Sequence, residues 1–189
     1  MGIQHNERDP HWNYFLALEE DVGRLSRWIE FSAVNESTYS IELARLLMAA
    51  AAEADVVSKR ICRRLDPDSG AKSINAYQRV ILSAYPRLPE VKVPMPRFGM
   101  LFTPWKEWEK PESPPFWWTA NNKVKHHRQE HFADANLKNV LNATAGLLLL
   151  LAISYDHVVK VIKPAPMLFL PKEYASVSGN ELHIVWSGD

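Results

Sequence analysis

The stretch LKNVLNATAGLLLLLAISYDHVVKVI, residues 137–162, decides the fold. One stripe of mostly apolar residues returns along it at alternating steps of four and three. Its members are Leu137, Leu141, Thr144, Leu148, Leu151, Tyr155, Val158 and Ile162. This spacing is typical of a helix that buries one face against its neighbours. Residues 147–151 are all leucine, so we expect either the central helix of a bundle or part of a homodimer seam.

Two further long segments have the same helical period. The first carries Phe15, Leu18, Val22, Leu25 and Ile29, and the second carries Leu43, Leu47, Ala50, Ala54, Val57, Ile61 and Leu65. We predict that the second helix is capped at Ser37 or Thr38 and stops near residues 66–70, where proline, glycine and aspartate cluster. Residues 73–85 predict a shorter helix that ends before Pro86.

Residues 86–115 are different, because eight of the thirteen prolines lie there. Proline has no backbone N–H, so this segment cannot be a regular helix or a central strand. We expect a long ordered excursion with short extended pieces near residues 98–102. Its tryptophans, Trp105 and Trp108, either anchor it to the bundle or stack on the bases of single-stranded RNA.

The C-terminal segment predicts a β-hairpin. Two short apolar runs, residues 167–170 and 182–186, flank the turn signal at residues 178–180. The fold class that follows is all-α: an antiparallel bundle of four to five helices with a Pro-rich and aromatic insert. We expect a bundle domain over residues 1–163 and a tail over residues 164–189.

Composition and charge exclude several function classes. Lys+Arg and Asp+Glu both number 22, which argues against wholesale coating of nucleic acid or an anionic membrane. Cys62 is the single cysteine, so an internal disulfide and a Cys-rich zinc module are excluded. The first ten residues carry no export signal, and the longest apolar run, Ala145–Ile153, is far shorter than the about twenty residues of a bilayer span. We expect a soluble, cytoplasmic protein with no membrane partner.

The chemically dense segment is FWWTANNKVKHHRQEHFAD, residues 116–134. Three of the seven histidines lie within six residues, among three cations: they are His126, His127 and His131 with Lys123, Lys125 and Arg128. Histidine is the side chain best suited to proton transfer near neutral pH, and cations stabilise the charge on a phosphate as it reacts. The pattern therefore suits RNA cleavage by the adjacent 2′-hydroxyl, which needs no metal and no cofactor.

In this interpretation His126 moves the proton, and Lys123 and Arg128 complete the catalytic set. The substrate-binding residues are Asn121, Asn122, Lys125 and His127. The alternative is a solvated polar surface without a catalytic function. A second basic group, Lys59, Arg60, Arg63 and Arg64, ends the second long helix. It either satisfies the helix dipole or forms a phosphate-binding rim.

Four short motifs carry a resemblance to a known family. They are residues 26–31 (SRWIEF), 38–43 (TYSIEL), 53–57 (EADVV) and 122–128 (NKVKHHR). With them, residues 10–160 resemble HEPN-type helical proteins of bacterial defence, toxin–antitoxin and prophage systems. The resemblance implies an all-α bundle, a homodimer and a metal-independent endoribonuclease with a composite site at the dimer seam. It also implies RNA and a cognate antitoxin or another protein as partners.

The family signature is an arginine, often followed by a polar residue, with a histidine about four to six residues further on. His126 matches that histidine and Asn121 the polar neighbour, but Ala120 stands where the arginine belongs. Phosphate stabilisation must then come from Lys123, Lys125 or Arg128. Otherwise the protein is a non-catalytic helical binding member of the same fold.

A third hypothesis uses the same residues differently. His127, Glu130 and His131 fit the H-x-x-E-H pattern of inverted zinc peptidases, in which the two histidines bind zinc and the glutamate is the base. Those peptidases place a third ligand, a glutamate, far downstream in a much larger fold. Only Glu173 and Glu181 follow here, so this hypothesis ranks last and no metal ligand is assigned.

Overall fold

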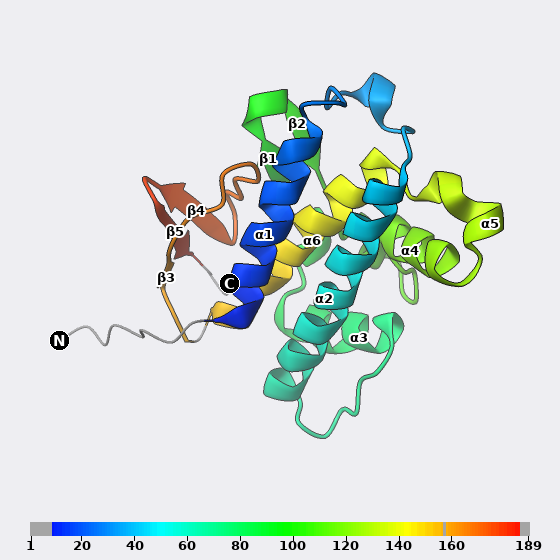
Figure 1. Cartoon of the computed structure of the whole chain (residues 1–189). Helices are drawn as coiled ribbons and strands as arrows, with labels where there is room; N and C mark the ends of the chain where they lie inside the picture. Colours follow the sequence, from blue (N-terminus) through cyan, green and yellow to red (C-terminus); the bar gives the residue numbers. More distant parts are fainter. Residues whose placement is uncertain (1–8, 157, 186–189) are drawn as a thin grey trace.

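The computed structural model describes residues 9–156 and 158–185, and these residues are mostly helical (Figure 1). Within them the helices are α1 (Pro10–Leu25), α2 (Ile41–Leu65), α3 (Ile74–Ala84), α4 (Phe116–His126), α5 (Arg128–His131) and α6 (Leu137–Tyr155). Two small antiparallel sheets accompany them. The predicted helical class is therefore correct in outline. Trp186, the last residue of the predicted apolar run, and residues 1–8 lie outside the described part of the chain.

Helix α6 is the central element of the fold. Every one of its residues except Lys138 is buried, and α1, α2 and α4 pack against it. Residues 147–151 are fully buried within this one chain, so these leucines have no exposed surface for a homodimer seam. Among the described residues, α6 is the one helix long and apolar enough to cross a membrane. However, 94% of its apolar window is buried inside the fold.

The start of α2 differs from the prediction. Its N-cap is Ser40, whose side chain accepts the Leu43 N–H at 3.0 Å, and not Ser37 or Thr38. Thr38 has another role, because its backbone carbonyl accepts the Leu137 N–H at 2.9 Å and so ties the α1–α2 connection to the start of α6. A short 3₁₀ helix, η1 (Ala33–Asn35), precedes this contact. The predicted stop after Leu65 is confirmed.

The Pro-rich excursion is ordered, as predicted, and it contains a small hairpin. Strand β1 (Val93–Met95) pairs antiparallel with β2 (Met100–Phe102), and Gly99 makes the turn with a φ of 62°. Three 3₁₀ helices complete the segment: η2 (Leu88–Glu90), η3 (Pro96–Phe98) and η4 (Lys106–Glu109). Trp105 and Trp108 are buried at 0% and 2% exposure. They anchor the excursion to the core and are not available to stack on RNA bases.

Gly146 gives the excursion room to dock on α6. Trp105 Nε1 donates to the Gly146 carbonyl at 3.2 Å, and a Cβ added at Gly146 would lie 3.2 Å from the Trp117 ring and 3.4 Å from Pro104 Cβ. We therefore expect Gly146→Ala to lower the free energy of unfolding by about 1 kcal/mol through overpacking. Urea denaturation followed by circular dichroism measures this change.

Gly23 in α1 is the matched control for that substitution. A Cβ there would meet only Leu168 Cδ1, at an ordinary 3.5 Å. Gly23→Ala should leave stability unchanged or raise it by up to about 1 kcal/mol, because alanine is the better helix former. Equal effects at the two glycines would contradict the close approach of the excursion to α6.

The C-terminal hairpin is present but begins later than predicted. Strand β4 (Ala175–Ser178) pairs with β5 (Glu181–Ile184) across a turn at Gly179, and β3 (Val161–Ile162) adds a third strand on the other edge of β5. Two predicted boundaries were wrong. Helix α6 ends at Tyr155, because residues 161–162 pair in this sheet, and residues 167–170 are not a strand.

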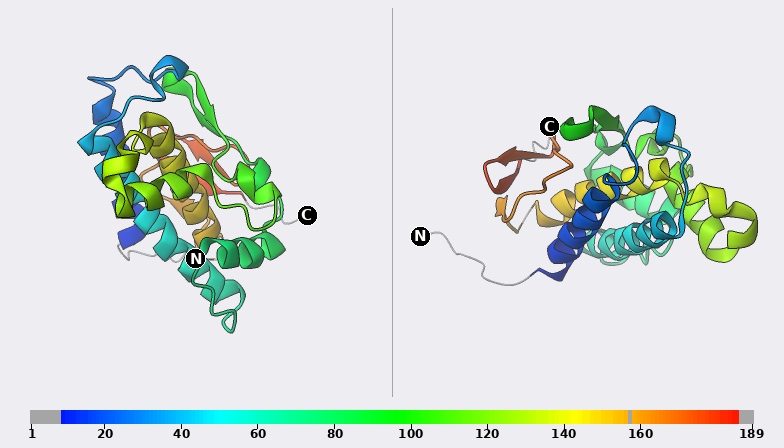
Figure 2. Two further views of the ribbon diagram at one scale, coloured as in Figure 1. Left: turned by 90° about the vertical axis from the view of Figure 1, so that its right-hand side faces the viewer. Right: turned by 45° about the horizontal axis from the view of Figure 1, so that its top comes forward.

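The buried carboxylate of Glu19 holds residues 167–169 against α1. Glu19 is 2% exposed and accepts the backbone N–H groups of Met167, Leu168 and Phe169 at 2.8–3.1 Å. Burial raises the pKa of Glu19 above its ordinary value, although these donors act in the opposite direction. The C-terminal sheet lies on one side of the bundle, and α4 and α5 lie on the other (Figures 1 and 2).

Candidate functional site

Helix α4 divides the predicted site residues between two faces. Its buried face is made of Trp117, Ala120, Asn121 and Val124, which pack toward the core. The other predicted residues are exposed: Asn122, Lys123, Lys125 and His126 on α4, His127 at the junction with α5, and Arg128 at the start of α5. We call these six exposed residues the α4–α5 surface. Figure 2 shows α4 and α5 at the outer edge of the bundle.

Few of these side chains have an acidic partner. Lys123 Nζ lies 3.9 Å from the carboxylate of Asp134, in η5 (Phe132–Asp134), and Asp134 also pairs with His131 Nδ1 at 3.4 Å. Lys125, His126, His127 and Arg128 form no ion pair within the part of the chain that the structure describes. Three of the six side chains are cations, and residues 122–128 contain no acid. The surface is therefore an exposed positive edge.

Two contacts fix the geometry of this edge. The rings of His126 and His127 lie 6.5 Å apart between centroids, with their planes tilted by 58°. Arg128 reaches back to α2, where its Nη2 lies 3.5 Å from the sulfur of Met48. The two imidazoles are thus neighbours on the exposed side of the chain, and the Arg128 guanidinium lies against α2.

Asn121 stands apart from the other predicted residues. It is 9% exposed on the buried face of α4, and its Oδ1 has no hydrogen-bond partner in the described residues. Six of the seven predicted site residues are therefore exposed, and Asn121 lies toward the core.

Ala120 lies on the buried face of α4, so this position does not suit an arginine. This residue is 6% exposed, and its position on α4 faces the core beside Trp117 and Val124. A guanidinium buried there without a partner would be strongly unfavourable. Any cation that acts with His126 must come from the exposed face, where Lys123, Lys125 and Arg128 lie.

The zinc pattern is broken by the local backbone. His127 has a non-helical conformation between α4 and α5, so His127 and His131 do not share one continuous helix. His131 pairs with Asp134 instead. Over residues 9–156 and 158–185, no group of three or more histidine, cysteine or acidic side chains is placed to hold a metal ion.

Sequence reasoning missed a polar cluster at the start of α1. His11 Nδ1 lies 2.5 Å from Glu53 Oε1, although 42 residues separate them, and Asp9 lies 3.6 Å from Arg60. The guanidinium of Arg60 also lies over the Tyr155 ring, 5.7 Å from its centroid. The residues come from α1, α2 and α6, and no local sequence signal connects them. The cluster joins the three helices at one end of the bundle.

Comparisons with known proteins identify no relative of this chain. No protein-family model, no curated protein and no solved structure matches the chain significantly.

Proposed function

We propose that this protein is a HEPN-like, RNA-directed helical module whose α4–α5 surface contacts the phosphate backbone. The observation that supports it most is the set of four side chains, Lys125, His126, His127 and Arg128, exposed together without an acidic partner in the described residues. Exposed cations of this kind bind nucleic acid by releasing counterions from the phosphates. The neutral total charge is no obstacle, because Lys123, Lys125 and Arg128 lie in a segment, residues 122–128, that contains no acid.

We propose that the same surface cleaves RNA without a metal. His126 accepts the proton of a ribose 2′-hydroxyl, the 2′-oxygen attacks phosphorus, and the bond from phosphorus to the 5′-oxygen breaks. His127 gives its proton to that leaving oxygen, and the products are a 2′,3′-cyclic phosphate and a 5′-hydroxyl. In-line displacement needs proton acceptor and donor on opposite sides of the phosphate. The 6.5 Å between the two rings leaves room for it.

The cations of the α4–α5 surface stabilise the charge that the phosphate gains in this reaction. Arg128 adjoins the histidine pair in sequence, and Lys123 lies one helical turn before it. The resemblance to HEPN proteins also implies a homodimer. In a homodimer whose seam includes this surface, the cations of one copy face His126 of the other and supply the charge that Ala120 does not.

The burial of Ala120 favours a second candidate, a non-catalytic RNA-binding or interaction protein of the same fold. With the arginine position facing the core, the exposed face keeps cations for binding but lacks the family's usual pairing of arginine and histidine. The two candidates share the binding surface and differ in whether His126 and His127 transfer protons.

Cleavage separates the two candidates. If the protein is an enzyme, we expect it to degrade mixed-sequence RNA in the presence of EDTA, and His126→Ala to slow this by about 100-fold or more. The matched control is His183→Ala in β5, on the opposite side of the bundle (Figure 1). A gel assay of fragments with a cyclic-phosphate end measures the rate. Equal rates for the His126 variant and the unchanged protein would end the ribonuclease proposal.

Binding tests the part that both candidates share. We expect the double variant Lys125→Ala, Arg128→Ala to weaken single-stranded RNA binding and to reduce the slope of log K against log salt by about 1.4. Lys172→Ala, an exposed cation of the C-terminal segment, is the control. Binding without cleavage supports the second candidate. Unchanged affinity and slope in the double variant would overturn both.

A further inference from the structure

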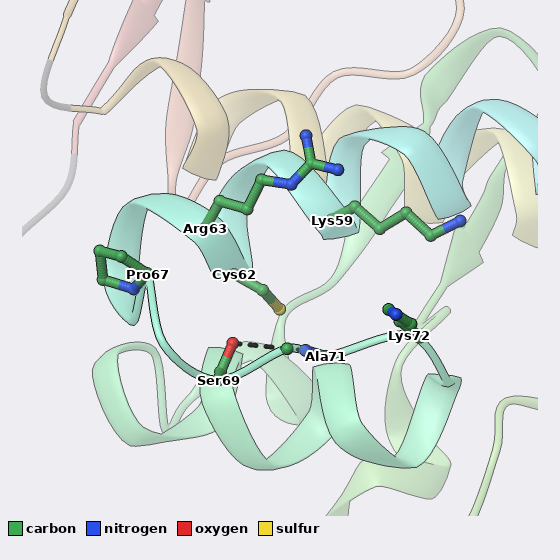
Figure 3. Close-up of a pocket in the computed structure, with 8 residues that line it drawn as sticks. Lys59, Cys62, Arg63, Pro67, Ser69, Ala71 and Lys72 are labelled. Atoms are coloured by element: carbon green, nitrogen blue, oxygen red, sulfur yellow. Dashed lines mark hydrogen bonds between the residues drawn. The ribbon is translucent and has the colours of Figure 1, made fainter.

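A pocket of about 390 Å³ lies between α2 and the loop that leads to α3 (Figure 3). Its lining consists of Lys59, Cys62, Arg63, Pro67, Ser69, Gly70, Ala71 and Lys72. Arg128 reaches α2 at Met48, and Lys59 lies eleven residues further on, about 16 Å along a helix axis. The pocket therefore lies on a different part of α2 from the point that Arg128 contacts.

The lining of this pocket carries three positive side chains, and the carboxylate of Asp66 lies near Cys62. Three of its eight residues, Lys59, Arg63 and Lys72, are cations, and none is an acid. Lys59 also pairs with Asp55 at 2.5 Å, one turn earlier on α2. Arg63 and Lys72 are exposed and form no ion pair within the described residues. Two of the three cations are thus free to neutralise a bound anion.

The remaining walls suit an anion as well. The Cys62 side chain points from α2 toward the loop (Figure 3), and burial raises the pKa of its thiol to about 11, so the thiol stays neutral at pH 7. The Ser69 hydroxyl oxygen accepts the Ala71 N–H at 3.4 Å, which leaves its hydrogen available as a donor. Gly70 allows the loop to turn here with a φ of 56°.

We propose that this pocket binds a phosphomonoester, with the long side chains of Arg63, Lys72 and Lys59 turning toward the phosphate from the positions in Figure 3 and the Ser69 hydroxyl as a neutral donor. A phosphomonoester carries about −1.5 to −2 charges at pH 7, which matches two free cations and one shared cation. The volume is at the lower end of small-molecule sites, so an attached sugar and base also have space. The same group is found on a free nucleoside monophosphate and on the 5′ end of an RNA strand.

Calorimetry with the full chain tests the proposal, using inorganic phosphate, adenosine 5′-monophosphate and unphosphorylated adenosine as probes. We expect the monophosphate to bind and adenosine not to bind. The double variant Arg63→Ala, Lys72→Ala should weaken binding at least about tenfold, since each charge-assisted contact contributes substantially. Both residues are exposed, so the variant keeps its core. The control is Arg79→Ala, an exposed cation on α3 outside the lining.

A second arm identifies the source of the phosphate. Oligonucleotides with a 5′-phosphate and with a 5′-hydroxyl are compared on protein that carries the Lys125→Ala, Arg128→Ala substitutions, so that the α4–α5 surface does not contribute. A preference for the 5′-phosphate supports an RNA end as ligand, and binding of the free monophosphate alone supports a small molecule. No binding of any phosphorylated probe, or equal binding by the Arg63, Lys72 variant, overturns the proposal and leaves the proposed function untouched.

Discussion

Trp105→Ala is expected to lower the free energy of unfolding by about 3–5 kcal/mol. The Trp105 ring is fully buried and lies 4.3 Å from the Trp108 ring and 5.2 Å from the Trp117 ring between centroids. Its Nε1 donates to the Gly146 carbonyl at 3.2 Å, so the substitution also removes a bond between the excursion and α6. Three effects lower the stability: the apolar surface of the ring is no longer buried, a cavity remains, and the Gly146 carbonyl loses its donor. Urea denaturation followed by far-ultraviolet circular dichroism measures it.

Trp28→Ala is the matched control, because the Trp28 side chain is 76% exposed in the turn that follows α1. We expect this substitution to change the free energy of unfolding by no more than about 0.5 kcal/mol. A loss of less than about 1 kcal/mol for Trp105→Ala would show that the Pro-rich excursion is not part of the cooperative core.

Elements whose signals are local could be predicted from the sequence. The leucines of α6 indicate a helix buried on all sides, and it is the central helix. The turn signal at residues 178–180 predicts the hairpin of β4 and β5. The N-cap of α2 could not be predicted, because serine or threonine stands at three of the four positions 37–40. Thr38 instead accepts the Leu137 N–H through its carbonyl, a bond that joins residues distant in the chain.

The candidate site was predictable to a similar extent. The spacing of Trp117, Ala120 and Val124 already marks the buried face of α4, and Asn121 falls on that face beside them. A helical projection of residues 116–126 could therefore have separated Asn121 from Asn122. In contrast, the α2–α3 pocket depends on a loop that folds back beside Lys59, and the spacing of residues along α2 does not contain that information.

Glu19→Ala is expected to cost at least about 3 kcal/mol, because it leaves three backbone N–H groups without their acceptor. The C-terminal segment would then separate from α1, and hydrogen exchange at the amides of residues 167–169 should become about 100-fold faster or more. Glu20→Ala is the control, since Glu20 is exposed and pairs only with Arg24 in the described residues. Unchanged exchange at residues 167–169 would contradict the role of Glu19.

The pH dependence of stability shows which of two opposing effects dominates at Glu19. Its pKa is raised above the ordinary 4.5 by burial, so the folded chain binds more protons than the unfolded chain above that pH. Stability should therefore fall as pH rises from about 4.5 through the folded pKa, and stay constant above it. Glu19→Gln cannot titrate at this position and serves as the reference. We expect the free energy of unfolding of the unchanged protein, minus that of Glu19→Gln, to fall over this pH range. Urea denaturation between about pH 4 and 8 measures it. A difference that rises with pH would instead mean that the three N–H donors outweigh the desolvation of the carboxylate, and that the charge itself holds the C-terminal segment.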